Sequence, residues 1–137
     1  MNKEKMNLWN RDFELYFSYS CYPGEEVTEI QKNAAREFCE DISVVTDALD
    51  DLKKYVEKTS DTEVKASEIE NIFKYVMPKS IFIPRASSKM VAIICNYKFD
   101  MENGIAIVFE NGQLKEIGPQ DIILWEENIY DRQGNCW

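Results

Sequence analysis

The dipeptide Asn111-Gly112 constrains the fold of this chain more than any other feature of the sequence. It follows the apolar run 105–109 and precedes the alternating run 113–117, and both of its residues tolerate the positive φ angles of a type I′ turn. Two runs joined in this way predict a β-hairpin. The run 90–97 is mostly apolar on both faces, which predicts a central strand. Further short strands are predicted at 80–83 and 122–125.

The N-terminal half of the chain has a different pattern. Leu8 to Tyr19 alternates imperfectly between apolar and polar residues, which predicts a single strand. Helices are then predicted to begin at Thr28, near Ser43 and at Ser67, because apolar residues recur with helical spacing after each of them. Thr28 and Ser67 also have the spacing of a capping box, and Pro78 is expected to end the third helix.

Together these elements predict an α+β domain. One N-terminal strand precedes about three helices, and an antiparallel β-meander of about four short strands follows, with a single layer of helices on the sheet. A length of 137 residues suits one domain, 1–137, since a chain of this size buries enough surface for a single core. The polar residues 126–137 are expected to form a loose tail of that domain.

Charge excludes several classes of partner. The chain holds 25 acidic and 16 basic residues, which gives a formal net charge of −9. Binding to nucleic acid and binding to an anionic membrane surface both depend on clustered lysine and arginine, so neither is expected. A basic protein partner suits this charge, because opposite charges steer two proteins toward each other.

Histidine is absent from the sequence. Hydrolases that use an imidazole base and zinc sites with histidine ligands are therefore excluded within one chain. The sequence also lacks the glycine-rich motifs G-x-x-x-x-G-K-[ST] and G-x-G-x-x-G, so neither a nucleotide nor any other cofactor is predicted. A carboxylate mechanism, or a lone cysteine or lysine nucleophile, is the catalytic chemistry that remains.

Three features predict a cytoplasmic protein. The charged N-terminus is not followed by the apolar stretch of a secretory signal. No apolar run approaches the roughly 20 residues that span a bilayer. The four cysteines are far apart and irregularly spaced, which favours reduced thiols over a disulfide framework.

The first candidate binding residues are two tyrosines. A dense group of aromatic residues lies between Trp9 and Tyr22, and about half of such a group is needed for the core. Tyr16 and Tyr22 are expected to point outward. Exposed tyrosines often anchor a protein partner, so these two are predicted to contact one.

A second set of candidates lies in two polar loops. Asp100 and Glu102 are calcium-ligand types, but their spacing does not match that of a calcium-binding loop, so no metal site is predicted. Gln120 and Asp121 follow a Gly-Pro break, and they either point into a cleft or close a turn through hydrogen bonds to the backbone. All four are candidate binding residues, and no residue is assigned a catalytic role.

The same C-terminal part resembles a known family. Asp100-Met101-Glu102 leads through Asn103 into Gly104, a strand follows, Asn111-Gly112 turns the chain, and Gly118-Pro119-Gln120-Asp121 closes the pattern. This order is similar to the C-terminal signature of a bacterial family that is classed only as a domain of unknown function. The resemblance extends to the opening strand and helix pair. It implies a bacterial cytosolic protein, in a family without established catalytic residues.

Two functional hypotheses of different classes remain. The favoured one is a small, non-catalytic protein-binding module of immunity or regulatory type that engages a basic partner, because the chain is acidic and carries no catalytic motif. The alternative is a small enzyme or ligand-binding domain that uses carboxylates, with Asp100, Glu102 and Asp121 converging on one pocket. Association into a homo-oligomer that covers an exposed sheet edge is also open.

Overall fold

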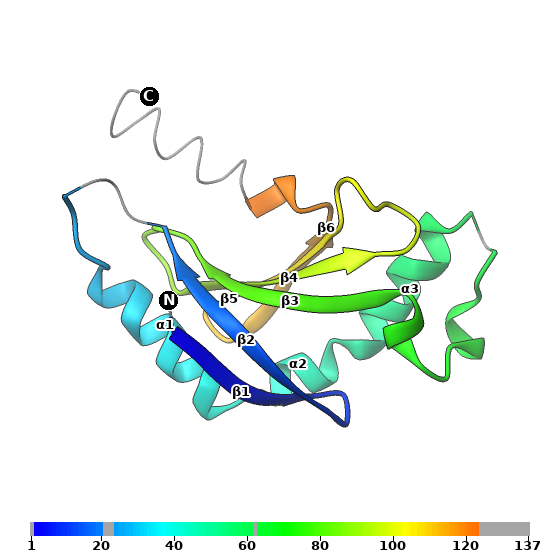
Figure 1. Cartoon of the computed structure of the whole chain (residues 1–137), viewed down its shortest axis with the longest axis horizontal. Coiled ribbons are helices and arrows are strands. Elements are labelled where there is room, and N and C mark those ends of the chain that lie inside the picture. The colour runs from blue at the N-terminus through cyan, green and yellow to red at the C-terminus, as the bar shows by residue number, and fades with distance from the viewer. Residues whose placement is uncertain (1, 21–23, 62, 124–137) are drawn as a thin grey trace.

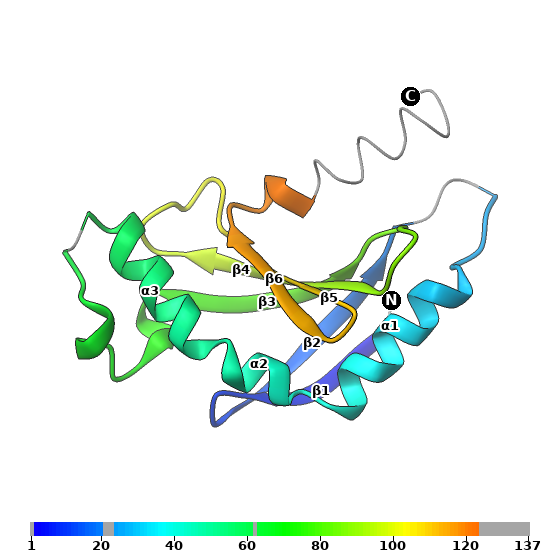
Figure 2. The ribbon, with the colours of Figure 1, turned by 180° about the vertical axis from the view of Figure 1, so that it is seen from behind.

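The computed structural model describes residues 2–20, 24–61 and 63–123. In this part of the chain, six strands form one sheet in sequence order (Figure 1). The strands are β1 (Asn2–Leu8), β2 (Arg11–Tyr19), β3 (Val76–Ile83), β4 (Met90–Tyr97), β5 (Ile105–Glu110) and β6 (Gln113–Gly118). The helices are α1 (Glu29–Glu40), α2 (Ser43–Asp47) and α3 (Leu49–Thr59), followed by the 3₁₀ turns η1 (Ala66–Glu68) and η2 (Ile72–Lys74). Figure 2 shows α1, α2 and α3 in front of one face of the sheet.

The sheet is mixed, because β2 and β3 run parallel while every other neighbouring pair is antiparallel. A parallel pair cannot be joined by a tight turn, so the connection from β2 to β3 must cross one face of the sheet. This connection carries α1, α2, α3, η1 and η2. The predicted layout of one strand, three helices and an antiparallel four-strand meander is therefore wrong.

The main error lies at the N-terminus. The segment that was predicted as one strand contains a turn at Trp9 and Asn10, whose φ angles are +50° and +69°. These angles join β1 and β2 into a two-residue hairpin in which Leu8 pairs with Arg11. Tryptophan is an uncommon residue at positive φ, so its sequence gives no turn signal. The Trp9 indole N–H donates to the Val45 carbonyl oxygen at 2.9 Å, which holds the turn against α2.

The predicted helices are partly confirmed. α1 begins as expected after the N-cap Thr28, with both hydrogen bonds of the capping box to Gln31. The helix predicted from Ser43 is divided at Ala48, which ends α2 and precedes α3. The third predicted helix is wrong: η1 and η2 are separate 3₁₀ turns, and Pro78 lies within β3 beside a register shift. A proline is tolerated at such an irregularity because it has no N–H to contribute to the ladder.

The C-terminal strands are confirmed through β6, and the last prediction differs. Asn111 and Gly112 have φ angles of +52° and +80° and form the expected hairpin turn between β5 and β6. The strand predicted at 122–125 is wrong in its described part, since 121–123 form a helical turn. Residue 124 onward, including the predicted tail 126–137, lies outside the described residues.

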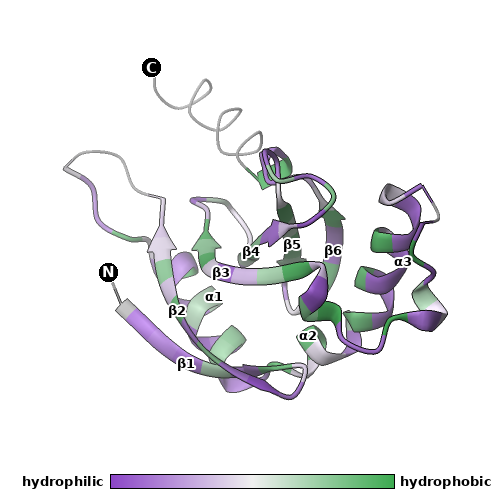
Figure 3. Ribbon diagram, turned by 45° about the vertical axis from the view of Figure 1, so that its right-hand side comes forward, coloured by the Kyte–Doolittle hydropathy of each residue, from purple (hydrophilic) through white to green (hydrophobic). Residues whose placement is uncertain are grey.

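Apolar residues pack on both faces of the central strands. The larger cluster lies between the helices and the sheet, and it includes Phe38, Leu52, Ile93 and Ile107. A smaller cluster lies on the opposite face. Its buried members are Met90, Ala92, Ala106, Val108 and Ile123. Figure 3 shows the hydrophobic colouring of β5 and the largely hydrophilic colouring of the edge strand β1. The prediction of a central strand at 90–97 is confirmed by this burial.

Gln31 ties the helical connection to both parallel strands. Its side chain is 1% exposed. The Nε2 group donates to the carbonyl oxygens of Ser20, at 2.9 Å, and Ile83, at 3.1 Å, just where β2 and β3 end. Its Oε1 accepts from the backbone N–H of Thr28 at 2.9 Å. One amide side chain thus bonds a carbonyl group at the end of each strand and an N–H group at the start of α1. These hydrogen bonds replace those that the amide would make with water, so its burial is tolerated.

Two turns lock together at the other end of β4 and β5. The N–H of Gln120 donates to the Asn103 carbonyl oxygen at 3.0 Å, and its Nε2 donates to the Cys95 carbonyl oxygen at 3.0 Å. Gly104 lies beneath this amide with a φ of +59°. A Cβ atom at Gly104 would lie against Gln120 Nε2 and 2.5 Å from the Cys95 carbonyl oxygen. Glycine is therefore required here by both the backbone angle and the space.

Replacing Gln31 with leucine should destabilise the protein by about 2–4 kcal/mol, because buried carbonyl and N–H groups would lose their partners. Urea unfolding followed by circular dichroism measures this loss. Lys32→Leu is the matched control, since Lys32 is the exposed neighbour on the same helix. A surface change of this kind is expected to stay within about 0.5 kcal/mol. Equal losses in the two variants would contradict the role given to Gln31.

Gly104→Ala should destabilise the protein by about 3 kcal/mol or more, since the new methyl group meets a backbone carbonyl that cannot move aside. Gly112→Ala is the matched control: Gly112 also has a positive φ, but a Cβ there meets no atom within 4 Å. It should cost about 1–2 kcal/mol, from the backbone angle alone. Thermal unfolding of both variants compares them, and a larger loss at Gly112 would refute the crowding argument.

Candidate functional site

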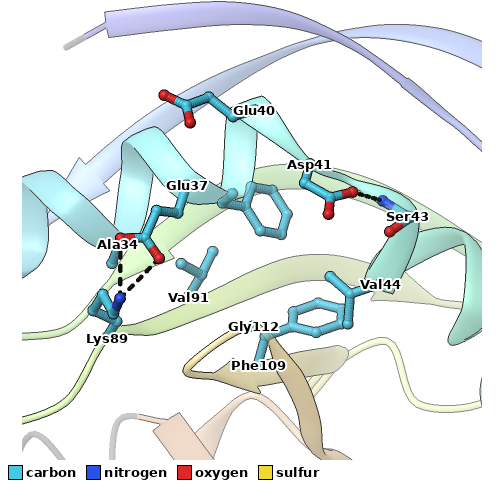
Figure 4. A pocket seen from close by; sticks show the side chains of 11 residues that line it. Ala34, Glu37, Glu40, Asp41, Ser43, Val44, Lys89, Val91, Phe109 and Gly112 are labelled. Atoms are coloured by element: carbon cyan, nitrogen blue, oxygen red, sulfur yellow. Dashed lines mark hydrogen bonds and ion pairs between the residues drawn. The ribbon is translucent and has the colours of Figure 1, made fainter.

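The candidate site is a groove between the helices and the end of the sheet. It has a volume of about 310 Å³. It lies where α1 ends, where α2 begins, and where β4 and the β5–β6 turn approach them (Figure 4). The lining residues are Ala34, Glu37, Phe38, Glu40, Asp41, Ser43, Val44, Lys89, Val91, Phe109 and Gly112. We call this site the α1 groove.

The floor of the α1 groove is apolar. Phe38, on the buried side of α1, and Phe109, on β5, have ring centroids 5.9 Å apart with their planes tilted by 51°. Val91 pairs with Phe109 across β4 and β5, so its side chain lies on the same face of the sheet. Tilted aromatic rings at this separation attract each other, so the pair forms a packed apolar base for the groove.

The rim of the α1 groove is acidic. Glu37 and Glu40 lie in the last turn of α1, and Asp41 is its C-cap. Figure 4 shows Glu37 directed toward Lys89 and Asp41 toward Ser43, while the Glu40 side chain points away from the floor. Hydrogen bonds from the Ser43 side chain and backbone N–H hold the pKa of Asp41 below its ordinary value, so this carboxylate keeps its negative charge in mild acid. The backbone bond measures 3.1 Å.

Each rim carboxylate has a different neighbour. Glu37 forms an ion pair with Lys89, with Nζ 2.8 Å from Oε1. Oε1 of Glu40 lies 3.6 Å from Nε of Arg36, one turn back on α1. Both side chains are more than half exposed. Exposed pairs of this type are weak, so Glu40 remains available to another cation. An apolar floor with a carboxylate rim can bind a side chain that has an alkyl stem and a positive end.

The structure places the predicted tyrosines away from this groove. Tyr16 is 45% exposed, and it lies on the face of β2 opposite to the buried Leu15 and Phe17. Lys3 Nζ lies 4.8 Å from the centre of the Tyr16 ring. Tyr22 lies outside the described residues. Tyr16 is therefore exposed on the face that does not carry the helices.

The predicted loop residues meet at the other end of β4. Gln120 joins their two turns as described above, and Asp100 Oδ1 accepts from the Asn103 N–H at 3.1 Å. Glu102 and Asp121 are exposed. Burial raises the pKa of Tyr55, and the nearby Tyr97, Asp100 and Asp121 raise it further, which places Asp100 and Asp121 near one phenol. None of these four candidates lines the α1 groove.

The rim residues were missed in the sequence, although part of their signal was readable. Glu37 and Asp41 are four positions apart at the end of a predicted helix, so their proximity was available from the periodicity. Lys89 is 52 residues away from Glu37, and no local pattern joins them. Among the described residues, no group of three or more histidine, cysteine, aspartate or glutamate side chains is placed to hold a metal ion.

One of three comparisons with known proteins, the one with family models, gives a match. No curated protein and no solved structure matches it. In the described segments, no helix has both the length and the apolar character needed to cross a membrane. A family model with the description "Domain of unknown function (DUF6985)" matches residues 2–124. The predicted resemblance to a family of this kind is confirmed, and the chain belongs to the DUF6985 family.

Proposed function

We propose that this protein is a non-catalytic binding module of the bacterial cytoplasm, of immunity or regulatory type, that engages a basic protein partner at the α1 groove. The observation that carries the proposal is the apolar floor of the groove with the carboxylates of Glu37 and Asp41 beside it. A lysine or arginine side chain suits both parts of this site: its stem lies on apolar surface while its charge stays among carboxylates.

The overall charge supports the same partner. A net charge of −9 attracts a basic protein over distances of about a Debye length, roughly 8 Å at physiological salt. Long-range attraction of this kind brings partners together but carries little specificity. Glu37 and Asp41 add a defined place for the contact, since both lie beside the apolar floor.

The alternative, a carboxylate enzyme or ligand-binding domain, has weaker support. Asp100 and Asp121 do approach Tyr55. However, Asp100 is engaged with Asn103, and Gln120 is engaged with the Cys95 carbonyl oxygen, so both side chains serve the turns that hold them. A residue that already fixes a turn is poorly suited to exchange protons with a substrate. A homo-oligomer across a sheet edge stays a prediction.

The combined change Glu37→Gln, Glu40→Gln and Asp41→Asn should weaken binding of a basic peptide by about tenfold, because the negative charge at the groove is lost. The probe is acetyl-Leu-Arg-Leu-Arg-amide, and its citrulline counterpart tests the need for charge. Amide chemical shifts in a nuclear magnetic resonance titration at low salt report both the dissociation constant and the location. The amides of Lys89 and Gly112 should shift first.

The matched control is the combined change Glu63→Gln, Glu68→Gln and Glu70→Gln. These three residues are exposed between α3 and β3, and their loss changes the net charge by the same three units, from −9 to −6. This variant should bind the peptide almost as tightly as the natural protein. If both variants lose the same affinity, or if the citrulline peptide binds equally well, the groove is not the binding site.

A further inference from the structure

Lys89 occupies the mouth of the α1 groove. Its Nζ lies 2.8 Å and 3.0 Å from the two carboxylate oxygens of Glu37 (Figure 4). Among the described residues that line the groove, it is the only cation. The groove thus already holds one basic side chain that reaches across from the sheet to α1, and this side chain meets one of the three rim carboxylates.

The main chain of Lys89 is held by backbone hydrogen bonds, while its ammonium group is held by one exposed ion pair. Its N–H donates to Asn111 Oδ1 at 3.3 Å, and its carbonyl oxygen accepts from the Asn111 N–H at 2.8 Å. These bonds fix the backbone beside the β5–β6 turn. The ammonium group, in contrast, stands at the end of a flexible four-carbon stem and makes a single ion pair.

The ion pair between Lys89 and Glu37 is suited to exchange. The two side chains are 38% and 48% exposed, so water reaches both charges. A pair in this setting contributes little to stability, because solvent screens it and two long side chains must be held in place. Another cation of similar chemistry can therefore replace Lys89 at Glu37 without a large change elsewhere in the fold.

We infer that Lys89 acts as an internal competitor: in the free protein it takes the position at Glu37 that a basic side chain of the partner takes in the complex. This inference rests on the proposed function and adds a control on affinity to the same site. Displacement of Lys89 lets the partner's cation reach Glu37, while the released ammonium group turns to solvent. The group that the partner offers for this exchange is a cation, because a neutral donor binds a carboxylate more weakly than the ammonium group that it would replace.

The variant Lys89→Met tests this inference, since methionine keeps an apolar stem and removes the charge. Binding of acetyl-Leu-Arg-Leu-Arg-amide should become about three- to fivefold tighter, which is the scale of one exposed ion pair. Lys58→Met is the matched control, because Lys58 is exposed on α3 outside the groove and its loss also takes the net charge from −9 to −10. The control should gain less than twofold from charge alone.

A second pair of variants isolates the exchange at Glu37. In a protein that carries Glu37→Gln, the further change Lys89→Met should give no gain beyond that of Lys58→Met, because the contested carboxylate is gone. Thermal unfolding and the amide spectrum establish that each variant is folded before binding is compared.

The outcomes separate the two proposals. Tighter binding by Lys89→Met that disappears with Glu37→Gln supports the inference. The inference is overturned if the natural protein binds the peptide and Lys89→Met binds it no more tightly, or if Lys89→Met and Lys58→Met gain the same affinity. Either result leaves the proposed function standing. A failure of the natural protein and of Lys89→Met to bind the peptide at low salt overturns the proposed function and, with it, the internal competitor.

Discussion

The parallel pairing of β2 with β3 is the constraint on which the rest of the structure depends. Two neighbouring strands that run the same way need a connection across the sheet, and here that connection carries α1, α2 and α3 over one face. Gln31 secures the arrangement by bonding the ends of both strands from the first turn of α1. The pairing of the strands therefore decides which face the helices cover. The hydrogen bonds of Gln31 hold the start of α1 at the ends of β2 and β3.

The α1 groove is a consequence of that placement. α1 lies over β3 and β4, while α2 approaches β6, so the chain turns from one helix to the next above the end of the sheet. At this turn Glu37 of α1 comes to face Lys89, beside the aromatic floor. The opposite ends of β4 and β5 are closed by two interlocked turns around Gly104 and Gln120. One end of the central strands is thus packed shut, and the other end carries the groove.

Elements whose hydrogen bonds join residues close in the sequence could be predicted from the sequence. The β5–β6 hairpin follows from Asn111-Gly112, and the start of α1 follows from Thr28, because in both cases the bonds involved join residues a few positions apart. The β1–β2 turn was hidden, since Trp9 adopts a positive φ that is accompanied by tertiary contacts, with its indole bonded to Val45 and packed on Phe73. The prediction of a third helix was wrong for a related reason. Ile69 and Ile72 have helical spacing, but both are buried in a segment that forms two separate 3₁₀ turns.

The sequence by itself determined the acidic charge, the absence of histidine, the match of residues 2–124 to the family, and the local turns and caps. Only the tertiary structure decided the parallel strand pair, the number of strands in the sheet, and the meeting of Glu37 with Lys89 across 52 positions. The physical reason is the range of the interactions. Turn and cap preferences act within a few residues and can be read in order, whereas strand pairing and ion pairs between distant residues exist only once the whole connection has folded onto the sheet.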